Sequence, residues 1–219
     1  MAGLVALISI PISITLGLWA AMHPGTRLDR MVTFGTLSTI SVPEFFIATI
    51  MVLIFAVKLK WLPATFNSMD AESFWVFLKG IAMPLITLVI VVSAQMIRMT
   101  RAGILNVMSS PYIEMARLKG VPQSRVITRH ALPNALAPVL VAIAFGVAGA
   151  ILTESSLSFL GIGVEPGVMT WGKLLTSARA DFSAWWLAII PGFAIFITVT
   201  IYNLIGEGLT DALDPKMKQ

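Results

Sequence analysis

The feature that most constrains this chain is a series of long apolar stretches that carry almost no charge. Each has between 18 and 27 residues, and the longest of them is interrupted only by Glu44. An α-helix rises about 1.5 Å per residue and must cover roughly 30 Å of hydrocarbon, so each stretch can cross a bilayer as a helix. We therefore expect about five membrane spans, at residues 3–22, 31–57, 80–97, 134–153 and 183–206.

Composition agrees with this class of protein and excludes others. Hydrophobic residues make up 57% of the 219 residues and charged residues 12%, which is about half of the charged fraction of a soluble domain. The chain contains no Cys, so neither a disulfide framework nor a thiolate metal site is available to it. The expected fold class is an all-α integral membrane protein, with residues 1–219 as a single transmembrane domain.

The basic residues predict how the spans are oriented. Spans alternate in direction, so residues 23–30, 98–133 and the C-terminal tail fall on one side, and that side holds ten of the fifteen Lys and Arg residues. Cytoplasmic loops of membrane proteins carry an excess of Lys and Arg. We therefore expect these three segments in the cytoplasm and residues 58–79 and 154–181 outside. The N-terminus then also lies outside, which indicates either that an uncharged amino end crosses the membrane or that a preceding helix belongs to the parent protein.

Residues 98–133 form a loop of 36 residues, which is too long for a passive connector. Ser110-Pro111 predicts the start of a helix and Gly120 its end, because Pro at the first helical position and Gly just past the last are the usual signals. Val121-Pro122 predicts the start of a second helix, and Leu132-Pro133-Asn134 predicts the bend into the next span. Such a helix pair is either a docking surface for a partner or a basic loop held at the lipid headgroups, and the residues alone leave both open.

The spacing of residues in this loop matches a known pattern. Glu114-Met115-Ala116 is followed after three residues by Gly120, and after nine more by His130-Ala131-Leu132-Pro133-Asn134. This arrangement resembles the EAA loop of permease subunits in ATP-binding-cassette importers, with Met115 in place of an Ala, and His130 with Leu-Pro-Asn resembles the oligopeptide, dipeptide and nickel branch. In that family the loop forms the coupling helix, which contacts a cytoplasmic ATPase subunit. The contact residues that the resemblance implies are Glu114, Met115, Ala116, Gly120, His130, Leu132 and Pro133.

Two further stretches resemble the same branch, and a third set resembles a different subunit of it. Residues 154–163, which contain a Leu-Ser-Phe-Leu-Gly motif, and residues 203–215 resemble the second of the two permease subunits. Leu28-Asp29-Arg30, Ser41-Val42-Pro43 and Lys60-Trp61-Leu62-Pro63 resemble the first. Which of the two subunits this chain represents therefore stays open. Subunits of this family usually have six helices, so the resemblance implies that the first helix is missing from this chain.

The resemblance implies a transmembrane permease subunit of an ATP-driven importer, for di- or oligopeptides or, less often, for a nickel chelate. It implies no catalytic residue and no cofactor bound by this chain, since ATP would be hydrolysed by partner subunits. The partners would be a second permease subunit in a heterodimer, two cytoplasmic ATP-binding subunits, an extracytoplasmic substrate-binding protein and membrane lipid, with no nucleic acid. The location would be the inner membrane of a prokaryote, as a multi-pass protein.

A secondary transporter or channel that acts alone is the main alternative. Such folds predict internal repeats and paired interrupted spans, and the sequence contains no convincing repeat. A signalling or assembly protein without transport is a third alternative, which the missing first helix leaves open.

The spacing of residues does not fit a phosphate-binding loop or a metal site. Gly167–Lys173 fits the first seven positions of a phosphate-binding loop, but Leu174 stands where Ser or Thr should hold Mg²⁺, and no strand is expected before it. His23 and His130 have no neighbours at ligand spacing, so we expect no metal site.

Glu44 is the one acidic residue placed well inside an expected span. A carboxylate at such a position costs about 2.5–3.5 kcal/mol on insertion scales, and it usually faces a bundle interior or a cavity. Pro43 beside it would break the local ladder of hydrogen bonds. Glu44 therefore either lines a transport path or lies where a helix ends, hydrogen-bonded between helices.

Two apolar features are candidates for packing. Ala142, Gly146 and Ala150 recur every four residues on the fourth span, as small residues do where helices approach closely; lining of a pore is the alternative. Residues 157–164 are apolar but too short to span, which indicates an interfacial or re-entrant segment.

Overall fold

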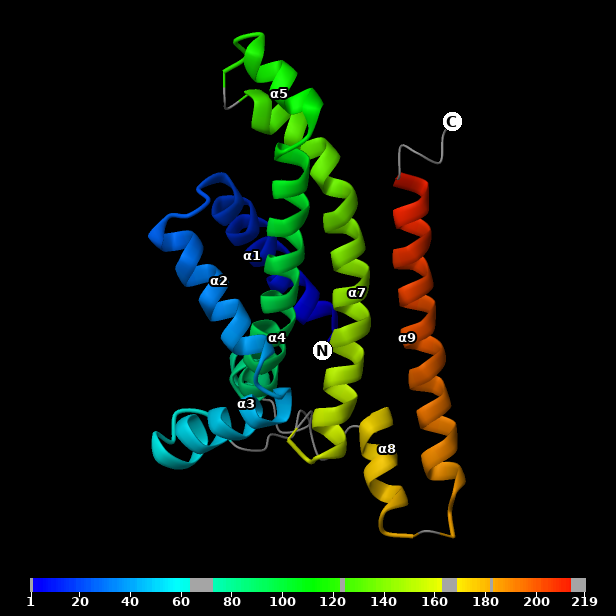
Figure 1. Cartoon of the computed structure of the whole chain (residues 1–219). Coiled ribbons are helices and arrows are strands. Elements are labelled where there is room, and N and C mark those ends of the chain that lie inside the picture. Colours follow the sequence, from blue (N-terminus) through cyan, green and yellow to red (C-terminus); the bar gives the residue numbers. More distant parts are fainter. Residues whose placement is uncertain (1, 64–72, 123–124, 163–168, 182, 214–219) are drawn as a thin grey trace.

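The computed structural model describes residues 2–63, 73–122, 125–162, 169–181 and 183–213, and in these residues it contains helices and no strand. Long helices run side by side along the molecule, and short helices lie at its two ends (Figure 1). In chain order the helices are α1 (Ala2–Met22), α2 (Arg27–Ile40), α3 (Glu44–Met51) continued by the π-helical η1 (Val52–Lys58), α4 (Phe74–Met108), α5 (Pro111–Leu118), the π-helical η3 (Val126–Ala131), α7 (Leu132–Phe159), α8 (Trp171–Ala178) and α9 (Trp186–Leu213).

Four of these helices are long and apolar enough to cross a membrane, namely α1, α4, α7 and α9. The pair formed by α2 and α3–η1 adds a fifth candidate when its two bent halves are counted as one span. The expected all-α membrane protein with about five spans is therefore confirmed.

The expected span at residues 31–57 is not one continuous helix, because the chain turns sharply in its middle. α2 ends at Ile40, α3 begins at Glu44, and the two helices are bent by 98° relative to each other. Pro43 explains the break, because a residue before Pro, here Val42, is pushed out of the helical region and Pro itself has no N–H to donate to the previous turn. The second half therefore leaves the direction of α2, at the end of the molecule opposite to α5 (Figure 1).

α4 is longer than expected at its C-terminal end. It continues past Ile97 to Met108, so the first part of the expected loop 98–133 is helical. This part contains no Pro, and the hydrogen bond from the Ser109 N–H to the Leu105 carbonyl closes the last turn. The charged residues after Ile97 indicate where α4 can leave the membrane. The helix itself need not end at that point, and it continues to Met108.

α7 is also longer than expected, because it covers residues 132–159 rather than 134–153. The segment 157–164, expected to be interfacial or re-entrant, therefore begins inside this helix, where Leu157 is 1% exposed. Its last two residues lie outside the described part of the chain. Ser155 and Ser156 lie just before this segment and Ser158 lies in it. Their hydroxyls donate to groups four residues earlier in the same helix, so these serines do not end the helix.

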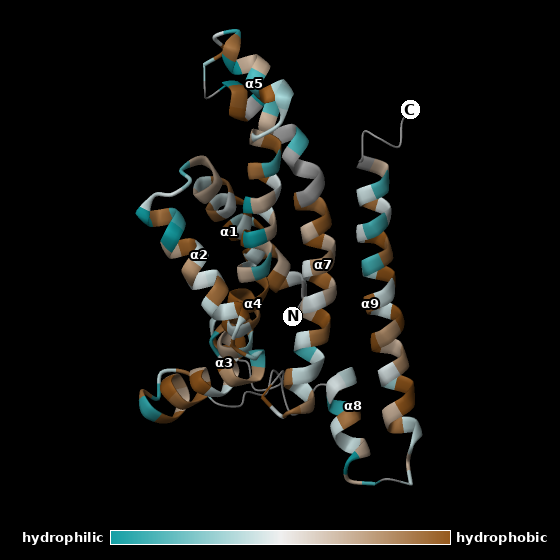
Figure 2. Ribbon diagram, in the orientation of Figure 1, coloured by the Kyte–Doolittle hydropathy of each residue, from teal (hydrophilic) through white to brown (hydrophobic). Residues whose placement is uncertain are grey.

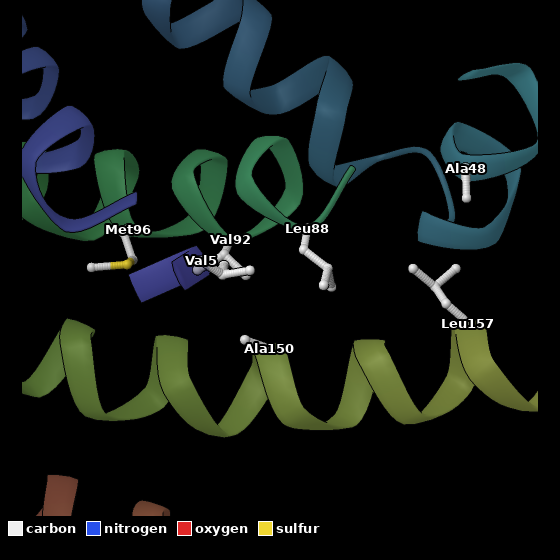
Figure 3. Close-up of a cluster of buried hydrophobic side chains, with 7 residues drawn as sticks. All are labelled: Val5, Ala48, Leu88, Val92, Met96, Ala150 and Leu157. Carbon is white, nitrogen blue, oxygen red and sulfur yellow. The ribbon is translucent and has the colours of Figure 1, made fainter. Parts of the chain in front are cut away.

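The core lies where α1, α3 and α7 pack against α4. Side chains from these four helices converge on one another, as Figure 3 shows for the residues of α4 that point towards α7. Lipid tails are as apolar as these side chains, so the packing itself, rather than escape from water, holds such helices together. The buried cluster consists of Val5, Ala48, Leu88, Val92, Met96, Ala150 and Leu157.

Small residues bring α1 and α7 close to α4. A Cβ added to Gly17 would lie 2.8 Å from the Cβ of Thr100, and a Cβ added to Gly146 would lie 2.9 Å from the Sδ of Met96. Ser9 and Ser13, at four-residue intervals before Gly17, are fully buried. Sequence reasoning missed this ladder on α1, although its spacing is the same as that of the ladder on α7.

Candidate functional site

The end of the molecule that carries α5 holds most of the residues expected to contact a partner. α5 begins as the sequence predicts, with Ser110 at the N-cap and Pro111 in the first helical turn, where a missing N–H costs no hydrogen bond. The Ser110 hydroxyl does not cap the helix, however, because it donates to the Val107 carbonyl at the end of α4. The start of α5 is therefore tied back to α4.

Gly120 ends α5 in a conformation that favours glycine. Its φ is +74°, in the left-handed region that costs other residues about 1–2 kcal/mol. The Gly120 N–H donates to the Arg117 carbonyl at 2.9 Å, and the Val121 N–H donates to the Ala116 carbonyl at 3.2 Å. These two bonds are the Schellman arrangement for a helix C-terminus, so the turn between α5 and the following segment has a defined shape.

The inner side of α5 is fixed by a small apolar cluster. Ile113 and Val126 are fully buried and Ala131 is 1% exposed, which joins α5 to η3 and the start of α7. Ala116 and Val121 pack against the same cluster. Ala116, expected as a contact residue, therefore lies half-buried on the inner side, where its small size lets α5 approach η3.

The outer side of α5 is apolar and exposed. Tyr112, Met115 and Leu118 are 44%, 54% and 77% exposed, and they follow one another at three-residue intervals, which places them on one face of the helix. Glu114 is exposed beside them in the first turn. Figure 2 shows hydrophobic and hydrophilic residues side by side on this helix. α5 therefore presents both apolar and charged groups outward.

The remaining residues of the expected contact set lie at the base of the loop. His130 is half-buried in η3, and its carbonyl accepts a hydrogen bond of 2.7 Å from Nδ2 of Asn134. Leu132 and Pro133 are the first two residues of α7, and their side chains lie outside the described ones. The chain stays helical from η3 into α7, so the helix does not break at the bend expected at residues 132–134, and only its winding changes there from π to α.

Two grooves run along α4 and meet on it. The first has a volume of about 510 Å³ and lies between α2 and α4, and the second has a volume of about 390 Å³ and lies between α4, α7 and α9. Gln95 and Met99 line both grooves. Ala142 and Gly146 of the expected small-residue ladder line the second, whereas Ala150 is 2% exposed in the core. Sequence reasoning missed both grooves.

Glu44 lies at the point where the bent span is broken. It is the first residue of α3 and is half-buried. A carboxylate in the first turn of a helix is stabilised by the exposed N–H groups and the helix dipole. No hydrogen bond joins its carboxylate to another helix in the described part of the chain, and it is not among the residues that line the two grooves.

Two further motifs from the sequence, the histidines and the phosphate-loop-like stretch, can be located at least in part in the described residues. Among the described residues no three His, Asp or Glu side chains come together as a metal site requires, and Nδ1 of His23 lies 3.1 Å from the Trp19 carbonyl of its own helix. The stretch Gly167–Lys173 begins outside the described residues, and its last three residues belong to α8.

Comparisons with known proteins agree on one family. The family model described as binding-protein-dependent transport system inner membrane component matches residues 13–219. A protein of Brucella suis biovar 1 (strain 1330), named for a peptide transport system permease, is 49% identical over 123 residues, which are 55% of this chain and 41% of the relative. The di/tripeptide transport system permease protein DppC of Pseudomonas aeruginosa (strain UCBPP-PA14) is 39% identical over 140 residues, which are 64% of this chain and 46% of the relative.

The dipeptide transport system permease protein DppC of Escherichia coli (strain K12) is 41% identical over 124 residues, which are 56% of this chain and 41% of the relative. The chain covers less than half of the length of each of these curated relatives. A chain in the crystal structure of an amino acid ABC transporter with histidines has a TM-score of 0.65, with 14% identity, over 95% of this chain and 88% of its own length. At this identity the likeness shows a shared fold alone.

Proposed function

This chain belongs to the family of binding-protein-dependent transport system inner membrane components, and we propose that it is a permease subunit of an ATP-driven importer for di- or oligopeptides. The relatives support the substrate class, because those named above are named for peptide, di/tripeptide and dipeptide transport. A nickel chelate is the second candidate substrate of the branch that the sequence resembles.

The geometry of α5 supports this function most strongly. The helix holds Tyr112, Met115 and Leu118 out of the protein, while buried Ile113 and the Gly120 turn fix it to α4 and η3. An exposed apolar face on a rigidly held short helix fits the groove of a partner protein. Glu114, Met115 and Gly120 then belong to a coupling helix that contacts a cytoplasmic ATPase subunit. The proposed contact set also includes Ala116, His130, Leu132 and Pro133.

The partners and location follow from the same proposal. A second permease subunit, different from this one, completes the path across the membrane, and two ATP-binding subunits attach from the cytoplasm. An extracytoplasmic binding protein delivers the peptide, and the location is the inner membrane of a prokaryote. The excess of Lys and Arg in residues 98–133 supports an orientation in which this segment lies in the cytoplasm. This chain contributes no catalytic step and binds no cofactor, because the partner subunits hydrolyse ATP.

Closure of the ATPase subunits around ATP moves α5 in this proposal. α5 is tied to α4 through Ser110 and Val107 and to α7 through η3. A displacement of α5 therefore passes directly to α4 and α7, two of the three helices that wall the second groove. The membrane helices then switch between inward and outward access to the substrate.

Reconstitution of the complete complex in proteoliposomes tests the function. Uptake of a labelled dipeptide should require ATP on the ATPase side and substrate-loaded binding protein on the other side, and it should persist when ion gradients are collapsed with ionophores. The control is the same complex with an ATPase subunit that binds ATP but cannot hydrolyse it. Uptake that follows an ion gradient and ignores ATP would support the secondary transporter and refute the importer.

A further inference from the structure

The two grooves on either side of α4 share one polar residue, Gln95. Its side chain is exposed, and no hydrogen bond joins it to another side chain or backbone group in the described part of the chain. The second groove contains another amide, that of Asn203 on α9. Both lie in helices that are apolar enough to span a membrane. Two amides that have no hydrogen-bond partner among the described residues therefore line a shared open surface.

The two amides lie at similar depth. α4 and α9 both begin towards the end of the molecule that carries α8 (Figure 1). Exposed Trp75 and Trp186 lie in their first turns, and Trp residues are enriched at membrane–water interfaces. With a rise of about 1.5 Å per residue, Gln95 lies about 30 Å along α4 and Asn203 about 26 Å along α9 from these markers. Both amides therefore lie towards the α5 end of the apolar spans. From there the second groove extends along α7 as far as Leu152, whereas the first extends along α4 towards α5, as far as Ala102.

Lipid tails are poor partners for this surface. An amide transferred to hydrocarbon without a hydrogen bond costs several kcal/mol. The side chain of Arg98, one turn from Gln95, also lines the first groove, together with the hydroxyl-bearing Thr33 and Thr36. The surface opposite Gln95 differs, because Ile90, about 140° around the helix, is exposed and apolar. α4 thus has one polar and one apolar exposed face.

We propose that Gln95, with Asn203 and Arg98, contacts the transported solute on its route through the membrane, and that the solute is a short peptide. The inference rests on the proposed function. A side-chain amide can both donate to and accept from a peptide backbone, and a guanidinium can bind a terminal carboxylate at two points. The groups on this surface match those of a peptide, whereas a purely apolar solute would leave them unpaired.

Cysteine labelling in the assembled complex tests whether this surface is wet. The chain has no native Cys, so single variants can be read directly when the partner subunits lack accessible Cys. Asn203→Cys and Leu204→Cys form a matched pair, because the two positions are adjacent and have the same depth, but Leu204 is 59% exposed on another side of α9. A small charged thiol reagent should react at least about tenfold faster at residue 203, because only the thiolate reacts and hydrocarbon suppresses its formation.

Gln95→Cys and Ile90→Cys should differ in the same direction, and dipeptide should slow labelling at residue 95. Equal rates within both pairs would overturn the assignment, whether lipid or a second subunit covers the surface. A failure of the proposed function would look different, because the unmodified complex would then take up no peptide with ATP. The ratio of labelling rates would still report whether water reaches the groove surface.

Transport by substituted complexes gives a second reading. Gln95→Leu keeps the approximate size of the side chain and removes its hydrogen bonds, and it should lower peptide uptake about tenfold, as expected when one hydrogen bond to substrate is lost. Ile90→Leu on the opposite face is the control, and it should leave both peptide uptake and ATP hydrolysis without substrate unchanged. Unchanged uptake by the Gln95→Leu complex would overturn the role of Gln95.

Discussion

Asp29 in the first turn of α2 and Arg101 on α4 form an ion pair with two hydrogen bonds. Nε of Arg101 lies 2.6 Å from Oδ1 of Asp29, and Nη2 lies 2.9 Å from Oδ2. The Gly25 N–H also donates to Oδ2, at 2.9 Å, so the carboxylate is held from both sides. Arg–carboxylate pairs of this geometry are the strong and directional ones. The turn between α1 and α2 is therefore fixed to the part of α4 that leads to α5.

Arg101→Leu should destabilise the assembled complex. The substitution leaves the Asp29 carboxylate, whose side chain is 6% exposed, without its partner. Because Arg101 itself is about a quarter exposed, we expect a loss of about 1–3 kcal/mol rather than the larger loss typical of a fully buried pair. Thermal unfolding of the purified complex measures it. Arg98→Leu is the control, since Arg98 makes no ion pair within the described residues, and equal unfolding temperatures in both variants would contradict the role of the pair.

The exposed face of α5 should bind the ATPase subunit and contribute little to the fold of this chain. Leu118→Ser should reduce retention of the ATPase subunit by about tenfold or more, because an exposed apolar anchor on a docking helix carries much of the binding energy. The unfolding temperature of the permease part should not change. Ile113→Ala is the matched contrast, since it opens a cavity under the same helix and should cost about 2–4 kcal/mol of stability.

Co-purification of the subunits and thermal unfolding separate these two effects. A Leu118→Ser variant that keeps its ATPase subunit with normal affinity would remove this face of α5 from the docking surface.

Local signals in the sequence were enough to predict α5. Ser110-Pro111 and Gly120 act within one helical turn, so they specify the ends of α5 without help from the rest of the fold. The break of the long apolar stretch at Pro43 also has a local cause, but the stretch 31–57 was predicted as one span because its apolar composition continues through the break. Here Pro43 decides the direction of the following helix, which the hydropathy around it does not show.

Features that depend on distant segments could not be predicted in this way. Asp29 and Arg101 are 72 residues apart in the sequence, and nothing local indicates that they meet. The grooves beside Gln95 arise because α2, α7 and α9 pack at particular positions along α4, and residue types alone do not fix those positions. The ladder of Ser9, Ser13 and Gly17 could have been found from its spacing, as the one on α7 was.

The orientation of the chain predicts opposite labelling of its two ends. Ser109→Cys, at the end of α4, should react with an impermeant thiol reagent only from the cytoplasmic side, because the proposed orientation places the basic loops there. Ser177→Cys on α8 should react only from the outside. Both serines are exposed, so access to the side of the membrane, rather than burial, decides the result. Labelling of residue 109 from outside in intact cells would reverse the topology.

Gly120 gives the sharpest test of the coupling role of α5. Its φ of +74° makes any side chain with a Cβ costly by about 1–2 kcal/mol, although no atom lies within 4 Å of the added Cβ. The effect is therefore on the backbone turn and not on packing. Gly120→Asp also adds a charge beside the docking face. We expect it, and to a lesser degree Glu114→Lys, to leave the chain in the membrane and abolish ATP-dependent uptake.

The series at residue 120 should rank by backbone preference. Gly120→Asn should retain more transport than Gly120→Ala, since Asn adopts the left-handed conformation more readily than other residues with a Cβ. Gly35→Ala on α2 is the control, because that glycine has no positive φ and open space around it, and it should transport normally. Uptake and binding-protein stimulation of ATP hydrolysis are the two measurements. Every variant should still insert into the membrane, because insertion depends on the apolar spans. Normal uptake by both Gly120→Asp and Glu114→Lys would contradict a coupling role for this loop.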